Sequence, residues 1–193
     1  MNFLKKLFNI PVKESKEVQK QEVDLALDDL FVHHFIEKGG KFLYCLKKEE
    51  LVNNFKNILK ENNWDGISLL DKKLSSLAGK NAKIIDGLKK EIPVFSSCEH
   101  LIADNGNILF SSKQLKSAKL CEMPLNFIVY AKTSQLVKNM GEGLTGIKVN
   151  HRDSLPTNIS AIKNYNFQQK DDSFLNYGNS NTKNLYLLLL EDL

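Results

Sequence analysis

Six consecutive apolar residues, Leu185–Leu190, place the strongest constraint on how this 193-residue chain folds. A strand that is apolar at every position suits burial on both faces, as in parallel sheets covered by helices. Leu125–Ala131 is a second run of this kind and predicts another buried strand. The two runs favour a fold built around a buried, mainly parallel sheet.

Helical and strand-length segments alternate in the first third of the chain. Val23–Lys38 has apolar residues at helical spacing and ends at Gly39-Gly40, a common helix stop. Phe42–Leu46 has the length of a strand, and Lys48–Asn63 is again amphipathic. This alternation predicts the α/β class. Further predicted elements are a helix over Asp71–Gly79, strands over Ala82–Asp86 and Pro93–Phe95, a helix over Thr133–Met140, and a helix from Ser154 or Thr157 to Asn164.

A hairpin is predicted around Asn105-Gly106, which separates the apolar stretches His100–Asp104 and Asn107–Phe110. Asn-Gly favours a two-residue type I′ turn because both central positions need positive φ.

Length and charge divide the chain into two parts. We expect one domain over residues 21–193, preceded by a basic tail over residues 1–20 with five lysines and two glutamates. Apolar residues within 3–8 share one helical face, so the tail is predicted to contact a membrane surface or a partner. The alternative is a frayed terminus that packs on its own domain.

Several classes are disfavoured by composition. No apolar run approaches 18 residues, residues 1–11 lack the apolar core of a secretory signal, and three widely spaced cysteines suit a reducing compartment. We therefore expect a cytoplasmic protein, with peripheral membrane contact through residues 3–8 as a variant. Arg152 is the one arginine among 27 basic residues, which argues against nucleic-acid binding.

No metal or cofactor motif is evident. Gly141–Gly146 fits GxGxxG in letters, but it follows a predicted helix rather than a strand, so we interpret it as a helix exit. His33 and His34 are adjacent on a helix and point about 100° apart, which disfavours a shared metal.

The densest polar segment is Ser96–Asn107, which combines serines, a thiol, an imidazole and two carboxylates around a tight turn. A second polar segment, Asn176–Lys183, precedes the last predicted strand and suits a loop that closes over a ligand. Polar loops at strand ends commonly carry binding sites in α/β proteins. The alternative for Ser96–Asn107 is a capped loop with a hairpin, and the alternative for Asn176–Lys183 is an ordinary surface connection.

Three segments give the chain a resemblance to a known family. They are the turn Ala103–Ile108, the segment Met123–Val137 and the C-terminal stretch Asn179–Asp192. In order and spacing, over about residues 22–193, the chain resembles the lactate-utilisation (LUD) domain family, the C subunits of bacterial L-lactate utilisation operons. The resemblance implies a twisted, mainly parallel sheet wrapped by helices, similar to sugar-phosphate isomerases and CoA transferases. It also implies a part in oxidising L-lactate to pyruvate with an iron–sulfur partner subunit.

The chain departs from the family pattern at three places. The family's Ala-Glu-Thr-Gly-Thr turn is Ala103-Asp-Asn-Gly-Asn107 here, its Gly-Pro-Ser segment is replaced by Asn158–Ile162, and its His-Gly-Pro by Gly178–Lys183. The chain therefore looks like a divergent member.

Two functions fit these residues. The first is an accessory or small-anion-binding subunit in organic-acid utilisation, with Glu99 and Asp104 as acid/base candidates. The predicted ligand-binding residues are Ser96, Ser97, His100, Asn105, Gly106, Asn107, Asn179 and Lys183, with Lys183 as the anion anchor. The second is a non-catalytic adaptor or regulatory protein that docks through its tail. Both an enzyme and a non-enzyme fit the sequence.

Overall fold

The computed structural model describes residues 26–165 and 181–192. The predicted tail and Asn179 lie outside these ranges, so the membrane or partner contact of residues 3–8 stays a prediction. Within the described ranges, no helix is both long and apolar enough to cross a bilayer.

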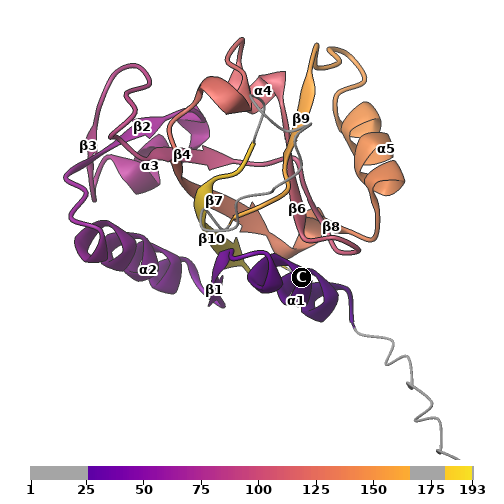
Figure 1. Cartoon of the computed structure of the whole chain (residues 1–193), viewed down its shortest axis with the longest axis horizontal. Coiled ribbons are helices and arrows are strands. Elements are labelled where there is room, and N and C mark those ends of the chain that lie inside the picture. The colour runs from indigo at the N-terminus through magenta and orange to yellow at the C-terminus, as the bar shows by residue number, and fades with distance from the viewer. Residues whose placement is uncertain (1–25, 166–180, 193) are drawn as a thin grey trace, which may run out of the picture.

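The predicted α/β class is confirmed by a six-stranded sheet in which every pairing is parallel (Figure 1). Its strand order is β1-β10-β7-β4-β2-β3. The strands are β1 (Lys41–Cys45), β2 (Gly66–Leu69), β3 (Lys83–Ile84), β4 (Val94–Ser97), β7 (Asn126–Lys132) and β10 (Asn184–Leu190). The sequence had not predicted β2.

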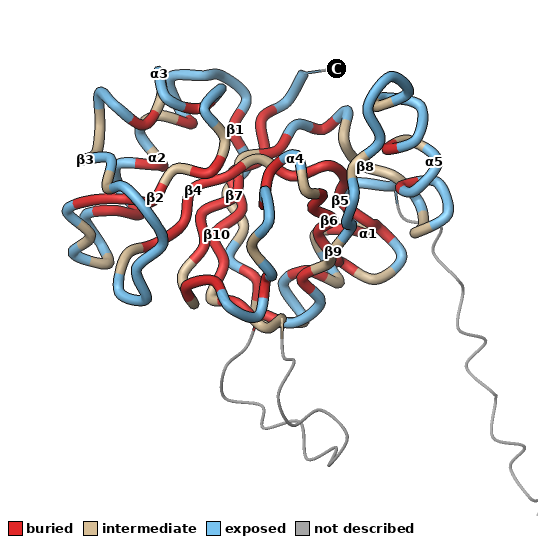
Figure 2. Tube along the Cα trace, turned by 90° about the horizontal axis from the view of Figure 1, so that it is seen from above, coloured by how far each residue is buried: buried red, intermediate tan, exposed pale blue. Residues whose placement is uncertain are grey.

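The two long apolar runs, now β7 and β10, are neighbours at the centre of this sheet, with Val129 opposite Leu187. Leu185, Leu187 and Leu189 pack into the core on one face, while Leu188 packs into the core on the other. Figure 2 shows these strands as the buried centre of the molecule. Their unbroken apolar sequence follows from this burial on both faces.

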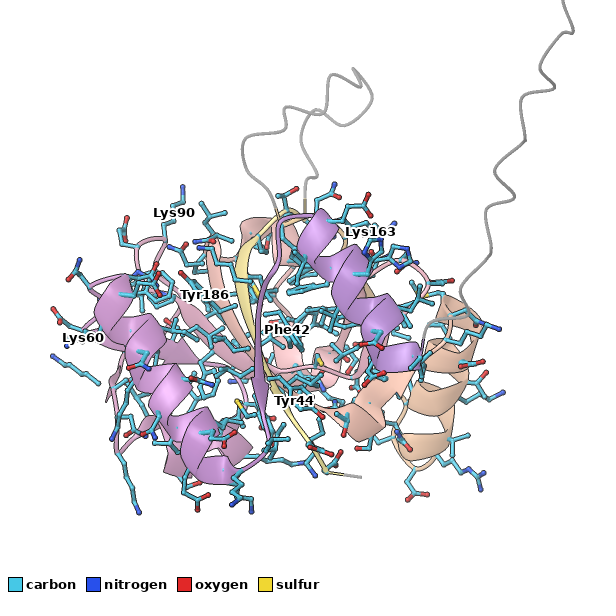
Figure 3. All side chains as sticks on the ribbon, turned by 90° about the horizontal axis from the view of Figure 1, so that it is seen from below. Phe42, Tyr44, Lys60, Lys90, Lys163 and Tyr186 are labelled. Carbon is cyan, nitrogen blue, oxygen red and sulfur yellow. The ribbon has the colours of Figure 1, made fainter. Side chains whose placement is uncertain are left out.

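One face of the sheet is covered by α2 (Lys48–Glu61) and α3 (Ser75–Ala78), which follows the short 3₁₀ helix η2 (Lys72–Leu74). Acidic residues in the first turn of α2 and Lys60 in its last turn complement the helix dipole. Phe55 of α2 packs on Phe95 of β4 with ring centroids 4.7 Å apart. The edge strand β1 lies between α1 and α2 in Figure 3, where its Phe42 and Tyr44 are labelled.

The other face is covered by α1 (Leu27–Glu37) and by a second, four-stranded sheet. That sheet has the order β8-β5-β6-β9. Its strands are β5 (His100–Ile102), β6 (Asn107–Ser111), β8 (Leu136–Val137) and β9 (Ile159–Ile162). The short helix α4 (Ser112–Leu115) follows β6, and α5 (Met140–Asn150) follows β8.

The predicted hairpin around Asn105-Gly106 is present as antiparallel β5 and β6, but the prediction of a two-residue type I′ turn was wrong. Ile102 pairs with Asn107, so four residues form the turn, and of these only Gly106 has a positive φ, 64°. Asn105 Oδ1 instead accepts a 3.0 Å hydrogen bond from the Asn107 amide, which is an Asx-type turn. Gly106 itself lies against the backbone of α1, where a Cβ would meet the Phe35 nitrogen at 2.6 Å.

Two predicted helices were wrong. Thr133–Met140 forms a 3₁₀ turn, η4 (Thr133–Gln135), and then β8, and the helix α5 begins at Met140 behind its cap Asn139. The segment expected to be a helix up to Asn164 forms β9 instead, because it pairs with β6. Pairing with a distant strand has overridden local preference in both cases.

Gly141–Gly146 lies within α5 and is not a helix exit. Two of its glycines allow α5 to approach the second sheet closely. A Cβ at Gly143 would meet Leu109 at 2.9 Å, and one at Gly146 would meet His100 Nε2 at 2.5 Å. These glycines therefore serve packing.

Candidate functional site

A cleft of about 1280 Å³ opens at the carboxyl ends of the main sheet. Ser97 closes β4, Lys132 closes β7 and Leu190 closes β10, and all three line the cleft. Leu51 and Val52 of α2 and Leu74 and Leu77 of the η2–α3 segment add apolar wall. Its volume exceeds what a three-carbon acid fills and lies above the usual range of about 300–1000 Å³ for ligand sites.

The cleft lies where the chain changes faces of the sheet. After β2 the chain joins the face covered by α2, and Leu74 packs there. After β4 it joins the opposite face, and Leu101 packs with α1. β2 and β4 are neighbours, and the segments that follow them turn to opposite faces of the sheet. A crevice therefore opens between the ends of the two strands. Ligands of open α/β sheets characteristically bind at such a switch point.

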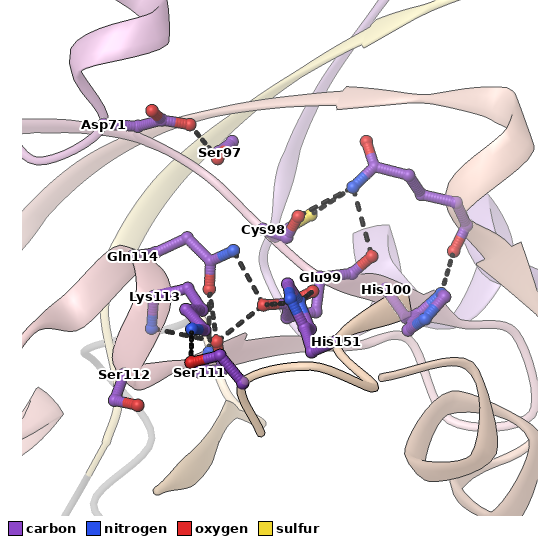
Figure 4. Close-up of polar contacts among 12 residues, drawn as sticks. Asp71, Ser97, Cys98, Glu99, His100, Ser111, Ser112, Lys113, Gln114 and His151 are labelled. Carbon is purple, nitrogen blue, oxygen red and sulfur yellow. Dashed lines mark hydrogen bonds and ion pairs between the residues drawn. The ribbon is translucent and has the colours of Figure 1, made fainter. Parts of the chain in front are cut away.

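Glu99 forms the centre of a polar network on one wall of the cleft (Figure 4). Its Oε1 accepts hydrogen bonds from the Ser111 hydroxyl at 2.5 Å and from Gln114 Nε2 at 2.9 Å. His151 Nε2 lies 3.1 Å from each carboxylate oxygen. Glu99 is buried, and the backbone on either side is fixed because Gln135 Nε2 donates to the carbonyls of Cys98 and Glu99.

The network keeps Glu99 ionised. Burial alone would raise the pKa of this carboxyl, but the hydrogen bonds from Ser111, Gln114 and His151 outweigh burial and lower the pKa. A carboxyl with a lowered pKa carries no proton at neutral pH. Glu99 is therefore not available as a general acid.

Six lysines surround the cleft from four directions, and they outnumber its two carboxylates, Asp71 and Glu99. They are Lys48 and Lys56 on α2, Lys73 on η2, Lys80 just after α3, Lys113 on α4 and Lys132 at the end of β7. Lys132 is paired with Asp192 at 3.1 Å, whereas none of the other five lies within ion-pair distance of a described carboxylate. The fold thus brings together lysines that lie far apart in the sequence.

Cys98 also lines the cleft but does not suit nucleophilic chemistry. Its side chain is buried, and burial raises its pKa far above the ordinary value. The thiolate is the reactive form, so this thiol is inert at neutral pH. Within the described ranges, no group of three or more His, Cys, Asp or Glu side chains is placed to hold a metal ion.

The residues predicted to form one site are divided between the two ends of the sheet. Ser97 and Glu99 line the cleft, but Asp104, Asn105, Gly106 and Asn107 lie at the hairpin tip beside α1. Lys38, which precedes β1, donates to the Asn105 carbonyl and to Asn107 Oδ1. The tip is therefore at the amino ends of the strands, and Asp104 and Glu99 do not converge.

Lys183 is not placed as an anchor in this cleft. It precedes β10 at the amino end of the sheet, is buried, and donates from Nζ to the Met123 carbonyl at 2.9 Å. Burial lowers the pKa of Lys183 to about 8.

Ser96 and His100 are also buried, and neither lines the cleft. The Ser96 hydroxyl donates to the Ser97 carbonyl at 2.9 Å, and His100 Nδ1 lies 3.2 Å from the Gln135 carbonyl.

His151 was missed by the sequence analysis, as were the cleft lysines. His151 follows α5, and its backbone amide donates to Ile147, so the end of α5 sets its position. Fifty-two residues separate it from Glu99, and no motif marks the pair.

Comparison with known proteins supports the fold. No family model matches the chain, and no curated protein matches its sequence. A crystal structure of a DUF162 family protein from Deinococcus radiodurans superposes with a TM-score of 0.59 at 12% identity, over 87% of this chain and 99% of that one. At this identity the likeness establishes a shared α/β fold, with a mainly parallel sheet flanked by helices.

Proposed function

We propose that this chain binds a small organic or phosphorylated anion in the cleft at the carboxyl ends of β2, β4 and β7. The gathering of six lysines carries the proposal, since five of them have no ion-pair partner among the described carboxylates and Lys132 alone is paired, with Asp192. In a concave, partly apolar cleft the attraction between a lysine and an anion is stronger than in open water, and an excess of positive charge attracts anions from solution.

The floor of the cleft favours an anion that also bears hydroxyl or carbonyl groups. The Asp71–Ser97 pair and the Glu99 network offer acceptors and donors to such groups, while the lysines face the charged part. The polar groups of the floor and the surrounding lysines together fit a hydroxy acid, an oxo acid or a sugar phosphate.

The resemblance and the fold give this binding a biological setting. The structural neighbour is a DUF162 protein, and DUF162 is a family of the lactate-utilisation type. We propose that the chain is an accessory subunit in organic-acid utilisation, with L-lactate or its product as one candidate ligand. An iron–sulfur partner subunit would then take the electrons, since lactate oxidation requires an acceptor.

Titration calorimetry tests the binding with L-lactate, pyruvate, dihydroxyacetone phosphate and inorganic phosphate. The double variant Lys73→Gln/Lys113→Gln is expected to weaken binding about 100-fold, since a hydrogen bond to a charged group contributes ~1.5 kcal/mol or about tenfold. The control is Lys90→Gln, an exposed lysine outside the cleft. No binding of any of these anions at millimolar concentration, or equal binding by all three proteins, would contradict the proposal.

A further inference from the structure

We infer that His151 is the proton acceptor of this cleft and that Glu99 is its positioning residue. The bound anion would then be one with a removable proton, such as an oxo acid or keto phosphate with a C–H bond next to its carbonyl. The inference rests on the proposed anion binding and adds a chemical step to it.

The contacts of His151 define which nitrogen is available. Its Nε2 faces both oxygens of Glu99 at 3.1 Å, and an ionised carboxylate only accepts hydrogen bonds. The hydrogen of a neutral ring therefore resides on Nε2, and the lone pair on Nδ1. Within the described residues, Nδ1 has no hydrogen-bond partner and is not among the buried polar atoms.

The exposure of the two side chains fits a role for His151 as proton acceptor and for Glu99 as positioning residue. The Glu99 side chain is 7% exposed and the His151 side chain 24%, so the imidazole lies on the cleft side of the pair. Glu99 is further held by Ser111 and Gln114, which form the capping box of α4. Its Oε1 thus accepts three hydrogen bonds and its Oε2 accepts one from His151, so the carboxylate is held in place facing the imidazole.

Both products of the proton transfer would be stabilised in place. The ligand C–H bond breaks, its electron pair stays on the ligand as an enolate, and the proton forms an N–H bond at His151 Nδ1. The resulting imidazolium is next to the Glu99 carboxylate. Lys113 donates to the Ser154 hydroxyl at 2.8 Å, and the Ser154 amide donates to the His151 carbonyl. Lys113 is therefore beside the same turn, as Figure 4 shows, and can stabilise the enolate oxygen.

A direct test is the protonation state of His151 in protein labelled with ¹⁵N at histidine. Long-range ¹H–¹⁵N spectra at pH 8 are expected to show His151 with hydrogen on Nε2 and a bare Nδ1, assigned by the variant His151→Gln. Glu99→Gln should shift the tautomer balance while the other histidine signals stay in place. A hydrogen on Nδ1 in the wild-type protein would overturn the inference.

The second test follows chemistry. Solvent deuterium is expected to enter pyruvate or dihydroxyacetone phosphate in D₂O, at whichever of these carbon acids calorimetry shows to bind. His151→Gln should slow the exchange at least 100-fold with Kd unchanged, in the range for loss of a general base. Glu99→Gln should slow it less and change its pH profile. The control is His33→Gln, an exposed histidine on α1.

The outcomes separate the two proposals. Binding without exchange, or exchange that survives in His151→Gln, would overturn the role of His151 and leave anion binding intact. Failure of both carbon acids to bind would remove the basis of this inference, and the lysine variants would then decide the anion proposal on the other probes.

Discussion

The Ser97 hydroxyl donates a 2.5 Å hydrogen bond to Asp71 Oδ2 and thereby joins the ends of two neighbouring parallel strands. After Asp71 the chain runs along the face covered by α2, and after Ser97 it runs along the opposite face. Asp71 also caps η2, because its Oδ1 accepts from the Lys73 amide at 2.9 Å. One carboxylate thus fixes both the floor of the cleft and the start of the segment that carries Lys73 and Lys80.

This double role predicts unequal costs for the two partners. Ser97→Ala removes one hydrogen bond to a half-buried carboxylate and should destabilise the protein by about 1 kcal/mol. Asp71→Ala also removes the cap and should cost about 2 kcal/mol. Urea unfolding measures both. Equal losses would mean that the cap contributes nothing.

Glu99 is expected to be the more sensitive position. Glu99→Ala leaves Ser111, Gln114 and His151 without their shared acceptor and should cost about 3 kcal/mol. Glu99→Gln keeps an acceptor oxygen and should cost about 1 kcal/mol. Chemical denaturation at pH 7 distinguishes the two variants.

The lowered pKa of Glu99 gives its contribution a defined pH dependence. A carboxyl whose pKa is lower in the folded state stabilises the protein fully above its ordinary pKa of 4.5. That stabilisation is lost as the pH falls below this value and through the folded pKa. The stability difference between wild type and Glu99→Gln should therefore shrink from pH 6 to pH 3. A difference that grows towards pH 3 would contradict this sign.

The central sheet was predictable because its signal is local. The runs that became β7 and β10 are apolar over most of their length, and burial on both faces of a sheet accommodates such runs. In contrast, Thr133–Met140 has no such signal. Its β8 residues pair with β5, and its first residues donate to Asp192, which accepts from Thr133 and Ser134. Such a contact between residues 59 apart is invisible to local patterns.

The site was half predictable for a geometric reason. Glu99 and Asp104 are close in sequence, but the strand β5 lies between them. Three strand residues carry the chain about 10 Å, so one end of the hairpin reaches the cleft and the other reaches α1. Residues near in sequence were thereby separated, while Glu99 and His151 were brought together. The cleft lysines likewise come from segments whose convergence only the fold decides.

Gly106 is expected to be a structural glycine. Its φ of 64° strains any L side chain, and a Cβ would press on the Phe35 and His34 backbone at 2.6 to 2.7 Å. Gly106→Ala should therefore cost about 2 kcal/mol or more. Gly87→Ala is the matched control, because Gly87 has φ 77° but nothing within 4 Å of the added Cβ. Equal losses in thermal denaturation would show that contact with α1 adds nothing to the strain.

The three cysteines should differ in reactivity. Cys45 and Cys98 are buried, and burial raises the pKa of both, whereas Cys121 is exposed. A thiol reagent at pH 7.5 is expected to label one cysteine per native chain and three after denaturation in urea. Peptide mapping should place the native label on Cys121. Rapid native labelling of Cys98 would show that the cleft wall opens.

Titration of Lys183 should raise the free energy of unfolding as the pH increases above neutral. Its pKa is about 8 in the folded state and 10.5 ordinarily, because burial disfavours the ammonium. Between these values the unfolded chain binds more protons than the folded one, so the free energy of unfolding rises with pH. Lys183→Met removes this titration, and the wild type should therefore gain stability relative to the variant between pH 7.5 and 10. Urea unfolding at the two pH values measures the gain. A constant difference would mean that Lys183 stays charged in the fold, sustained by the Met123 carbonyl that accepts its hydrogen bond.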